Sequence, residues 1–210
     1  MLLNRIKHIV FDLGGVLLNI DPEVSFNEFR RLKLMDEDKF KDLFIRQNLL
    51  FDLETGKASS AEFRERIKNY SLKTVSDEEI DFAWNALLLD FPMKRFEMLK
   101  KLKKHFYVHL LSNTNEIHYL CYAKNFEMQF NTGFDSMFHK LFLSYEMGLR
   151  KPDEQIFIKM LTDGDMHPVE TLFIDDTPEN IDAALKTGIQ AFHLQKEKDV
   201  TELMQELVQF

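Results

Sequence analysis

Five short apolar runs, spaced along the chain with helical segments between them, constrain the fold more than any other feature of the sequence. The runs are Ile6–Phe11, Phe106–Leu111, Leu141–Leu143, Leu172–Ile174 and Gln190–Leu194. Strands that alternate with helices are typical of a parallel sheet with helices on both faces. The pattern therefore predicts an α/β fold built on a doubly wound, Rossmann-like parallel sheet.

The stretch between the first two runs is far too long for one crossover and is predicted to be helical throughout. Ser59–Glu62 and Ser76–Glu79 each fit a capping box, in which a Ser caps the helix start and a Glu three residues later bonds back to it. Val24–Leu34 carries apolar residues at helical spacing, and Asp36 is expected to cap a helix over Glu37–Gln47.

This helical insert divides the chain into two expected units. Residues 1–18 and 88–210 are expected to form the α/β core, and residues 19–87 a small all-helical cap. An insert that leaves the sheet directly after its first strand is a natural lid for a site at that strand's end. We therefore expect the core to carry the chemistry and the cap to choose the substrate.

The charge balance excludes some classes of partner. The 210 residues include 27 basic and 35 acidic side chains, which gives a formal net charge of −8. Such a chain is a poor partner for nucleic acid or an anionic membrane, although one local lysine suffices for a small phosphorylated molecule. No signal peptide or apolar stretch of membrane-spanning length is evident. With one cysteine no intramolecular disulfide can form, which is typical of the cytoplasm. We expect a cytoplasmic monomer or weak homodimer.

Polar residues follow four of the five apolar runs, where the strands are expected to end. In doubly wound sheets ligands bind at these carboxyl ends, so the four segments are expected to meet at one mouth of the sheet. The segments are Asp12-Leu13-Gly14-Gly15, Ser112-Asn113-Thr114-Asn115, Arg150-Lys151-Pro152-Asp153 and Asp175-Asp176-Thr177-Pro178.

These residue types suit phosphoryl transfer. Carboxylates hold a hard divalent cation, a lysine and a hydroxyl hold an anion, and one further acid is placed to attack. Glycines let backbone amides approach an anion closely. The segment Ser112–Asn115 offers good N-cap residues, and hence a helix N-terminus aimed at the same place.

Two helix starts are predicted beside these segments. Lys151 is expected just before a helix whose first turn holds Pro152 and Asp153. Thr177 is expected to cap the next helix, with Pro178 at its first position and Gly188 just past its end near Thr187.

In this order the four segments resemble the motifs of the haloacid dehalogenase (HAD) superfamily, whose hydrolases pass through an aspartyl-phosphate. FDLGGVL is similar to the first motif, LLSNTN to the second, GLRKPD to the third and FIDD to the fourth. The resemblance covers nearly the whole chain and includes a helical cap after the first motif. DLGGVLLNID, LSNTN, RKP and DD-x-x-x-N look most like the branch that contains a bacterial α-glucose-1-phosphate phosphatase.

The resemblance implies a Mg²⁺-dependent phosphohydrolase that removes phosphate from a small metabolite such as a sugar phosphate. Asp12 would attack phosphorus and form the aspartyl-phosphate. Asp12, the Gly14 carbonyl, Asp175 and Asp176 would hold or orient Mg²⁺. The ion and Lys151 would shield the nucleophile from the negative charge of the phosphate.

The same resemblance assigns the phosphate-binding residues. Ser112 and Asn113 would hold the phosphoryl oxygens, with Ser112 also counted as catalytic. The backbone at Gly14 and Gly15 would join them, and Asn180 would orient the acid pair.

The chain departs from the family at Gly14. Many family phosphatases carry a second Asp at this position, two residues after the nucleophile, and it protonates the leaving group. Glycine keeps a carbonyl for the metal but cannot shuttle a proton, a function typically worth about 10²–10⁴-fold. Either the leaving group needs no help or another group substitutes. Asp21 is our candidate, although a simple cap of the helix that begins at Pro22 is favoured for it.

Three alternatives compete with a phosphatase. Dehalogenases of the family also lack the second Asp, but the acid pair Asp175 and Asp176 favours a metal-dependent phosphate enzyme. A low-activity phosphate-binding member is motivated by Gly14. A phospho-accepting receiver domain would carry its acid pair early in the chain and would have no helical insert.

The cap offers few candidates for substrate contact. Its polar and aromatic residues near expected loops or hinges are Arg46, Glu54, Lys57, Trp84 and Asn85. For each of them an ordinary surface or packing role is favoured. The seven histidines are scattered, and none is interpreted as a metal ligand.

Overall fold

The structure, a computed structural model, describes residues 5–33, 38–39, 42–71 and 73–208. Its centre is a five-stranded parallel sheet with the strand order β3-β2-β1-β4-β5. The strands are β1 (His8–Phe11), β2 (Tyr107–Ser112), β3 (Lys140–Leu143), β4 (Thr171–Asp175) and β5 (Gln190–His193). Because β1 lies between β2 and β4, the residue that follows β1 emerges at the middle of the sheet's carboxyl edge.

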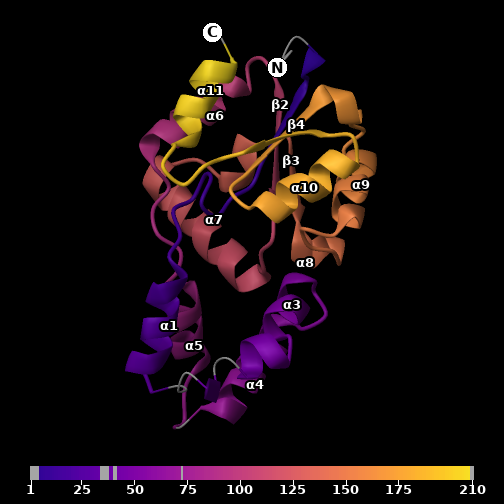
Figure 1. The fold of residues 1–210 in the computed structure, drawn as a ribbon. Coiled ribbons are helices and arrows are strands. Elements are labelled where there is room, and N and C mark those ends of the chain that lie inside the picture. The colour runs from indigo at the N-terminus through magenta and orange to yellow at the C-terminus, as the bar shows by residue number, and fades with distance from the viewer. Residues whose placement is uncertain (1–4, 34–37, 40–41, 72, 209–210) are drawn as a thin grey trace.

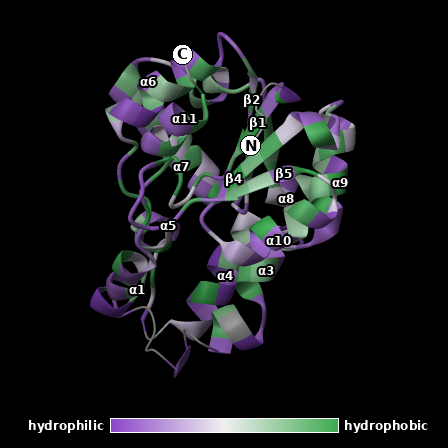
Figure 2. Ribbon diagram, turned by 45° about the horizontal axis from the view of Figure 1, so that its top comes forward, coloured by the Kyte–Doolittle hydropathy of each residue, from purple (hydrophilic) through white to green (hydrophobic). Residues whose placement is uncertain are grey.

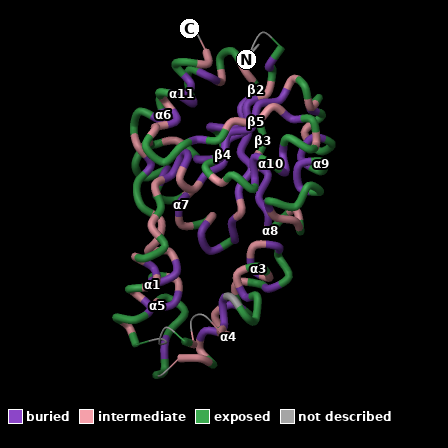
Figure 3. Tube along the Cα trace, in the orientation of Figure 1, coloured by how far each residue is buried: buried purple, intermediate pink, exposed green. Residues whose placement is uncertain are grey.

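The strands are apolar on both faces because helices cover both faces of the sheet. Along β1, Ile9 and Phe11 belong to one hydrophobic cluster and Val10 to another, as the alternation of side chains along a strand requires. The first cluster is completed by α6 (Met93–Leu102), α7 (Glu116–Phe130) and α11 (Val200–Leu207), and the second by α9 (Glu154–Asp163) and α10 (Pro178–Lys186). Figure 2 shows the hydrophobic strands, and Figure 3 shows that they are largely buried, apart from the edge strand β5.

The helical insert forms a separate group of helices at one end of the molecule (Figure 1). Its elements are α1 (Pro22–Arg31), the π-helical turn η2 (Asp42–Arg46), α3 (Leu49–Glu54), α4 (Ser60–Tyr70) and α5 (Asp77–Asn85). These helices bury a hydrophobic cluster of their own, around Phe29, Phe63 and Trp84. Ile117 of α7 joins this cluster, so the insert packs on the helix that follows β2.

Short elements complete the core. They are α8 (Ser144–Met147), η3 (Phe134–Met137) and η4 (Pro168–Glu170). Two antiparallel backbone segments join the insert to the core, and we call residues 19–21 and 87–90 the hinge. The amide of Asn19 donates to the Asp90 carbonyl at 3.0 Å, and the amide of Asp21 donates to the Leu87 carbonyl at 2.9 Å.

Most predicted elements are confirmed. All five strands form, with ends that shift by one or two residues. Both capping boxes have the two reciprocal hydrogen bonds of the motif, at Ser59 and Ser76. Pro178 opens α10 after Thr177, and Gly188 follows the helix with a φ of +83°.

Two helix predictions are wrong at their boundaries, and one falls partly outside the described residues. α1 starts at Pro22, where the side chain of Asp21 caps it, and ends at Arg31 rather than 34. α9 starts at Glu154, because the Asp153 carboxylate accepts from the Gln155 amide and is the cap. Asp36 and the start of its predicted helix are not described.

Candidate active site

Asp12 lies at the centre of the carboxyl edge of the sheet. Its amide donates to the Ile174 carbonyl at 2.9 Å, which continues the pairing of β1 with β4 by one residue. The chain then turns at once, since the amide of Leu18 donates to the Leu13 carbonyl at 2.8 Å. Asp12 is buried, with 8% of its surface exposed.

Lys151 joins two of the strand ends. Its ammonium donates to Oδ1 of Asp12 at 2.5 Å and to Oδ2 of Asp175 at 2.6 Å. The residue is only 2% exposed. A buried ammonium is stable only when it is paired, so the two carboxylates explain how this lysine is accommodated.

Asp175 is oriented by the start of the helix that follows it. Nδ2 of Asn180 donates to both carboxylate oxygens at 3.0 Å, and the Thr177 amide donates to Oδ1 at 2.8 Å. The carboxylate is fully buried and fully hydrogen-bonded. The structure therefore places Asn180 against Asp175, one of the two acids that it was expected to orient.

Three carboxylates form a group suited to a divalent cation. Asp12, Asp175 and Asp176 each offer an oxygen within 4.8 Å of the others. Gly15, with a φ of +79°, makes room for this group, because a Cβ there would collide with Oδ2 of Asp176. An all-oxygen set of acids is the donor chemistry that Mg²⁺ prefers, so these residues fit the expected cofactor.

The electrostatics of the group are dominated by burial. Burial raises the pKa of Asp12 to about 7, and Lys151 opposes that rise. Burial also raises the pKa of Asp176, with a further contribution from the nearby Asp175. For Lys151, burial alone would lower the pKa, but Asp12 and Asp175 outweigh it and the pKa is raised. The site therefore concentrates negative charge that a cation would relieve.

The polar residues at the end of β2 and just after it have different surroundings. Ser112 ends the strand and is buried. The side chain of Asn113 is engaged with the backbone of Lys151, accepting from its amide at 2.8 Å and donating to its carbonyl at 2.9 Å. The Asn113 side chain thus positions Lys151, while Asn115 caps α7 by accepting from the His118 amide.

Asp21 has a capping contact. Its Oδ1 accepts from the Glu23 amide at 3.0 Å at the start of α1. This geometry supports the interpretation of Asp21 as a helix cap. The role of Asp21 as a proton shuttle stays a prediction.

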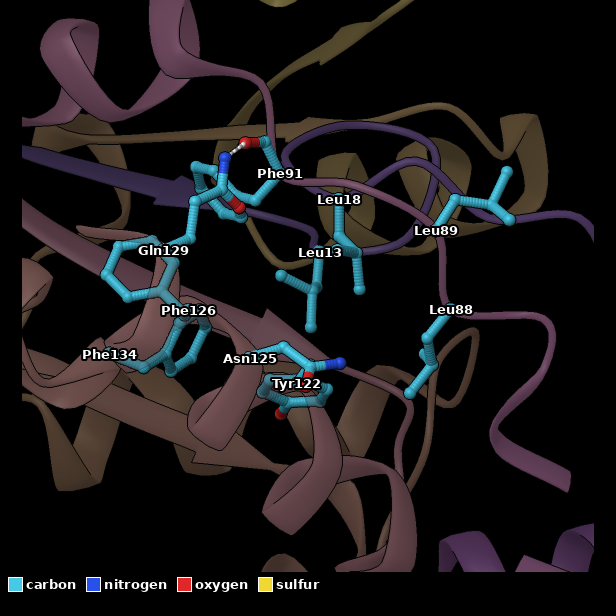
Figure 4. A pocket seen from close by; sticks show the side chains of 10 residues that line it. All are labelled: Leu13, Leu18, Leu88, Leu89, Phe91, Tyr122, Asn125, Phe126, Gln129 and Phe134. Carbon is cyan, nitrogen blue, oxygen red and sulfur yellow. Dashed lines mark hydrogen bonds between the residues drawn. The ribbon is translucent and has the colours of Figure 1, made fainter. Parts of the chain in front are cut away.

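Two cavities lie near the hinge and the site. Figure 4 shows a narrow one, lined mainly by apolar residues that include Leu13, Leu88 and Tyr122. It measures about 20 Å³, enough for roughly one water and far too small for a metabolite. The second, of about 450 Å³, lies between the insert and the core, where Phe51, Thr55 and Lys57 face residues 148–153.

Two contacts between insert and core were not predicted from the sequence. Trp84 stacks on His118 at 4.7 Å between ring centroids, and Nε2 of His118 donates to the Trp84 carbonyl at 3.1 Å. Arg150, next to Lys151, pairs with Glu54 at 3.1 Å. Trp84 and Glu54 were both named among the cap residues, but nothing in the sequence indicated their partners.

Comparison with known proteins places the chain in a family. Residues 6–188 match the model of the haloacid dehalogenase-like hydrolases. The chain belongs to this family. A D-ribitol-5-phosphate phosphatase of Bacteroides thetaiotaomicron is 33% identical over 189 residues, which cover 89% of this chain and 91% of that protein.

Solved structures agree with the family. A HAD family enzyme of Bacteroides thetaiotaomicron, in complex with magnesium and inorganic phosphate, superposes with a TM-score of 0.88 at 37% identity, covering 94% of this chain and 98% of that one. A predicted HAD-like hydrolase of Porphyromonas gingivalis gives a TM-score of 0.88 at 30% identity, covering 98% and 99%. Several dehalogenases below 20% identity share the fold alone.

The expected fold, family and enzyme class are therefore confirmed: the chain is a magnesium-dependent phosphatase of the HAD-like hydrolases that acts on a phosphorylated metabolite. Within the described ranges, every helix is too short or too polar to cross a bilayer.

Proposed function

We propose that this phosphatase acts on a small phosphorylated polyol or sugar and that Asp12 is its covalent nucleophile. The observation that carries the proposal is the buried bridge of Lys151 between Asp12 and Asp175, with Asp176 beside it. This arrangement holds one carboxylate at the middle of the sheet edge with a cation next to it. It is what attack on a phosphate dianion requires, because charge repulsion must be offset before the atoms can meet.

The reaction balances over two steps. In the first, a carboxylate oxygen of Asp12 forms a bond to phosphorus while the bond from phosphorus to the ester oxygen breaks, and the departing alkoxide takes up a proton from water. In the second, water attacks the phosphorus of the aspartyl-phosphate and gives up a proton to solvent, while the bond from phosphorus to the Asp12 oxygen breaks, which releases inorganic phosphate and restores the carboxylate.

The surrounding residues take supporting roles. Asp12, Asp175, Asp176 and the Gly14 carbonyl would hold Mg²⁺, which offsets phosphate charge when bound. Lys151 favours the ionised form of Asp12 and orients it, and Asn180 fixes Asp175.

We assign the phosphoryl oxygens to the hydroxyl of Ser112, the backbone after β2 and the backbone at Gly14 and Gly15. The side chain of Asn113 acts indirectly in this scheme, since it is already bonded to the backbone of Lys151. Oriented donors of this kind are worth most where water is excluded, as it is around these buried groups.

The relatives and the cavity support the proposed substrate class. The Bacteroides relative is named for D-ribitol 5-phosphate, a small hydroxylated phosphate ester. The cavity of about 450 Å³ between insert and core has polar side chains in its lining, among them Thr55, Lys57 and Arg150. Hydroxyl groups of a polyol would find hydrogen-bond partners there.

We further propose that residues 19–87 are a cap that moves about the hinge, with 1–18 and 88–210 as the core. The helices within residues 19–87 bury a hydrophobic cluster that is distinct from those around the sheet, which supports this division. A cytoplasmic location, as a monomer or weak homodimer, completes the proposal, supported by the single cysteine.

The decisive experiment compares Asp12→Asn with Asp182→Asn, an exposed aspartate of α10. Phosphate release from D-ribitol 5-phosphate and other sugar and polyol phosphates would be measured with Mg²⁺ and with EDTA. We expect Mg²⁺-dependent release, lost in Asp12→Asn and retained in Asp182→Asn. Full turnover by Asp12→Asn would show that the nucleophile is another residue.

A further inference from the structure

The two glycines after the nucleophile have neighbours of opposite chemistry. A Cβ on Gly15 would meet the Asp176 carboxylate, whereas a Cβ on Gly14 would lie 2.8 Å from Cδ1 of Ile20. Gly15 has a left-handed backbone that favours glycine, but Gly14 does not. A side chain at residue 14 would therefore have to displace the tip of Ile20, whereas the backbone at this position would accept it without strain.

The backbone of Ile20 is fixed in this place by the hinge. It forms an antiparallel bridge with Leu88. On either side, the amide of Asp21 donates to the Leu87 carbonyl and the amide of Leu89 donates to the Asn19 carbonyl, both at 2.9 Å. The side chain of Ile20 can rotate, but its Cα is held next to the loop that carries Asp12.

Ile20 also keeps an exposed surface. It is 38% exposed, so a branched apolar side chain meets solvent while its tip lies against the loop that carries Asp12. In-line attack sends the leaving group away from the attacking carboxylate. Lys151 contacts Oδ1 of Asp12 from the core, while Ile20 of the hinge lies against the nucleophile loop, so a leaving group that departs toward the insert would pass Ile20.

We propose that Ile20 is the wall against which the first carbons of the leaving group pack, and that it selects primary over secondary phosphate esters. The inference rests on the proposed function and adds a specificity-determining residue to it. A primary ester presents an unbranched CH₂ to this wall. A secondary ester presents a branched carbon, which must compete with the branched side chain of Ile20 for the same space.

The test uses two isomers with equal charge and equal atoms, glycerol 1-phosphate and glycerol 2-phosphate. The first is a primary ester and the second a secondary one. We expect the unaltered enzyme to prefer glycerol 1-phosphate in kcat/KM. Ile20→Ala should reduce that preference by about tenfold or more, since one or more methylenes in a packed site are worth about 10–200-fold in discrimination.

A second variant tests the geometry in the opposite direction. Gly14→Ala adds the Cβ that pushes the tip of Ile20 outward, so it should increase the preference for glycerol 1-phosphate. In the Ile20→Ala background the same substitution meets no isoleucine and should leave the isomer ratio unchanged. Non-additivity of the two substitutions would support direct contact between the two positions.

Leu89→Ala is the matched control, because Leu89 is an exposed apolar residue of the same hinge, 46% exposed. It should leave the isomer ratio as in the unaltered enzyme. An unchanged ratio in Ile20→Ala, in protein whose thermal unfolding shows that it is folded, would overturn the inference and leave the proposed function standing. Absence of Mg²⁺-dependent phosphate release from either isomer and from D-ribitol 5-phosphate would overturn both.

Discussion

Asn113 shows how a side chain can position another residue of a site through that residue's backbone. Both ends of its amide are bonded to the backbone of Lys151, 38 residues further along the chain. The end of β2 is thereby tied to the loop that carries the bridging lysine. Because Lys151 must reach Asp12 and Asp175 at once, a small shift of its backbone would lengthen at least one of the two contacts.

Asn113→Ala removes both of these bonds. We expect kcat/KM to fall by about 10–100-fold, since two hydrogen bonds of ordinary strength contribute about 1–3 kcal/mol together. Steady-state kinetics with the same phosphate ester would measure the loss, and Asn69→Ala, an exposed residue of α4, is the control. Equal kinetics for Asn113→Ala and the unaltered enzyme would show that Lys151 does not depend on this contact.

At the scale of the element, the capping residues could be predicted from the sequence, whereas the residues that contact α7 could not. Ser59 and Ser76 cap their helices as the local pattern predicts, because both halves of a capping box lie within four residues of each other. The stack of Trp84 on His118 joins two residues of different helices that are 34 positions apart in sequence. No periodicity in either segment encodes it.

The buried contact of His118 with Trp84 makes the stability of the folded chain depend on pH. Burial lowers the pKa of His118 to about 4, against a hydrogen bond to the Trp84 carbonyl that raises it. Its Nε2 donates to that carbonyl, so the neutral ring accepts at Nδ1 from Asn115 at 3.0 Å. Between about pH 6.5 and pH 4 the unfolded chain binds a proton here that the folded chain does not, so this contribution to stability is lost as pH falls.

His118→Phe keeps an aromatic ring and removes the titration. At pH 7 we expect a loss of about 1–3 kcal/mol in the free energy of unfolding, from the two hydrogen bonds. The difference from the unaltered protein should shrink by up to about 3 kcal/mol on going from pH 7 to pH 4. Urea denaturation at both pH values measures this, with His167→Phe as the exposed control. A difference that is independent of pH would mean that His118 is not buried in its neutral form.

At the scale of the whole molecule, the strand ends could be predicted and the side-chain contacts around them could not. Asp12 and Asp175 lie at the carboxyl ends of β1 and β4, and a parallel sheet brings such ends to one edge, so topology alone predicts their meeting. Lys151 follows β3 only after α8, so its reach to both acids depends on that loop as well. The approach of Ile20 to Gly14 depends on how the hinge strands pair and on one rotamer. Sequence spacing encodes neither the pairing of the hinge strands nor the rotamer of Ile20. The sequence alone therefore showed that Gly14 departs from the family pattern, but not that Ile20 lies against it.

The two halves of the molecule are also joined by charge. Arg150 of the core pairs with Glu54 of α3, and their side chains are 29% and 12% exposed. Burial raises the pKa of Glu54, and Arg150 and Lys151 lower it in part. The pair therefore links the docking of the insert to the loop that carries Lys151.

Arg150→Met should leave the Glu54 carboxylate in a poorly solvated place without its cation. We expect a loss of about 1–3 kcal/mol in the free energy of unfolding at pH 8, less than for a fully buried pair because Arg150 is partly exposed. The loss should be smaller at pH 5, since the Glu54 carboxyl, with its raised pKa, then takes up a proton, and the destabilisation grows as pH rises.

Glu54→Gln combined with Arg150→Met should restore most of the stability. Lys186→Met, which breaks the exposed pair with Glu154 (64% and 47% exposed), should change little. Chemical denaturation of the four proteins at both pH values makes the comparison. Equal losses for Arg150→Met and Lys186→Met would show that charge does not join the insert to the rest of the chain.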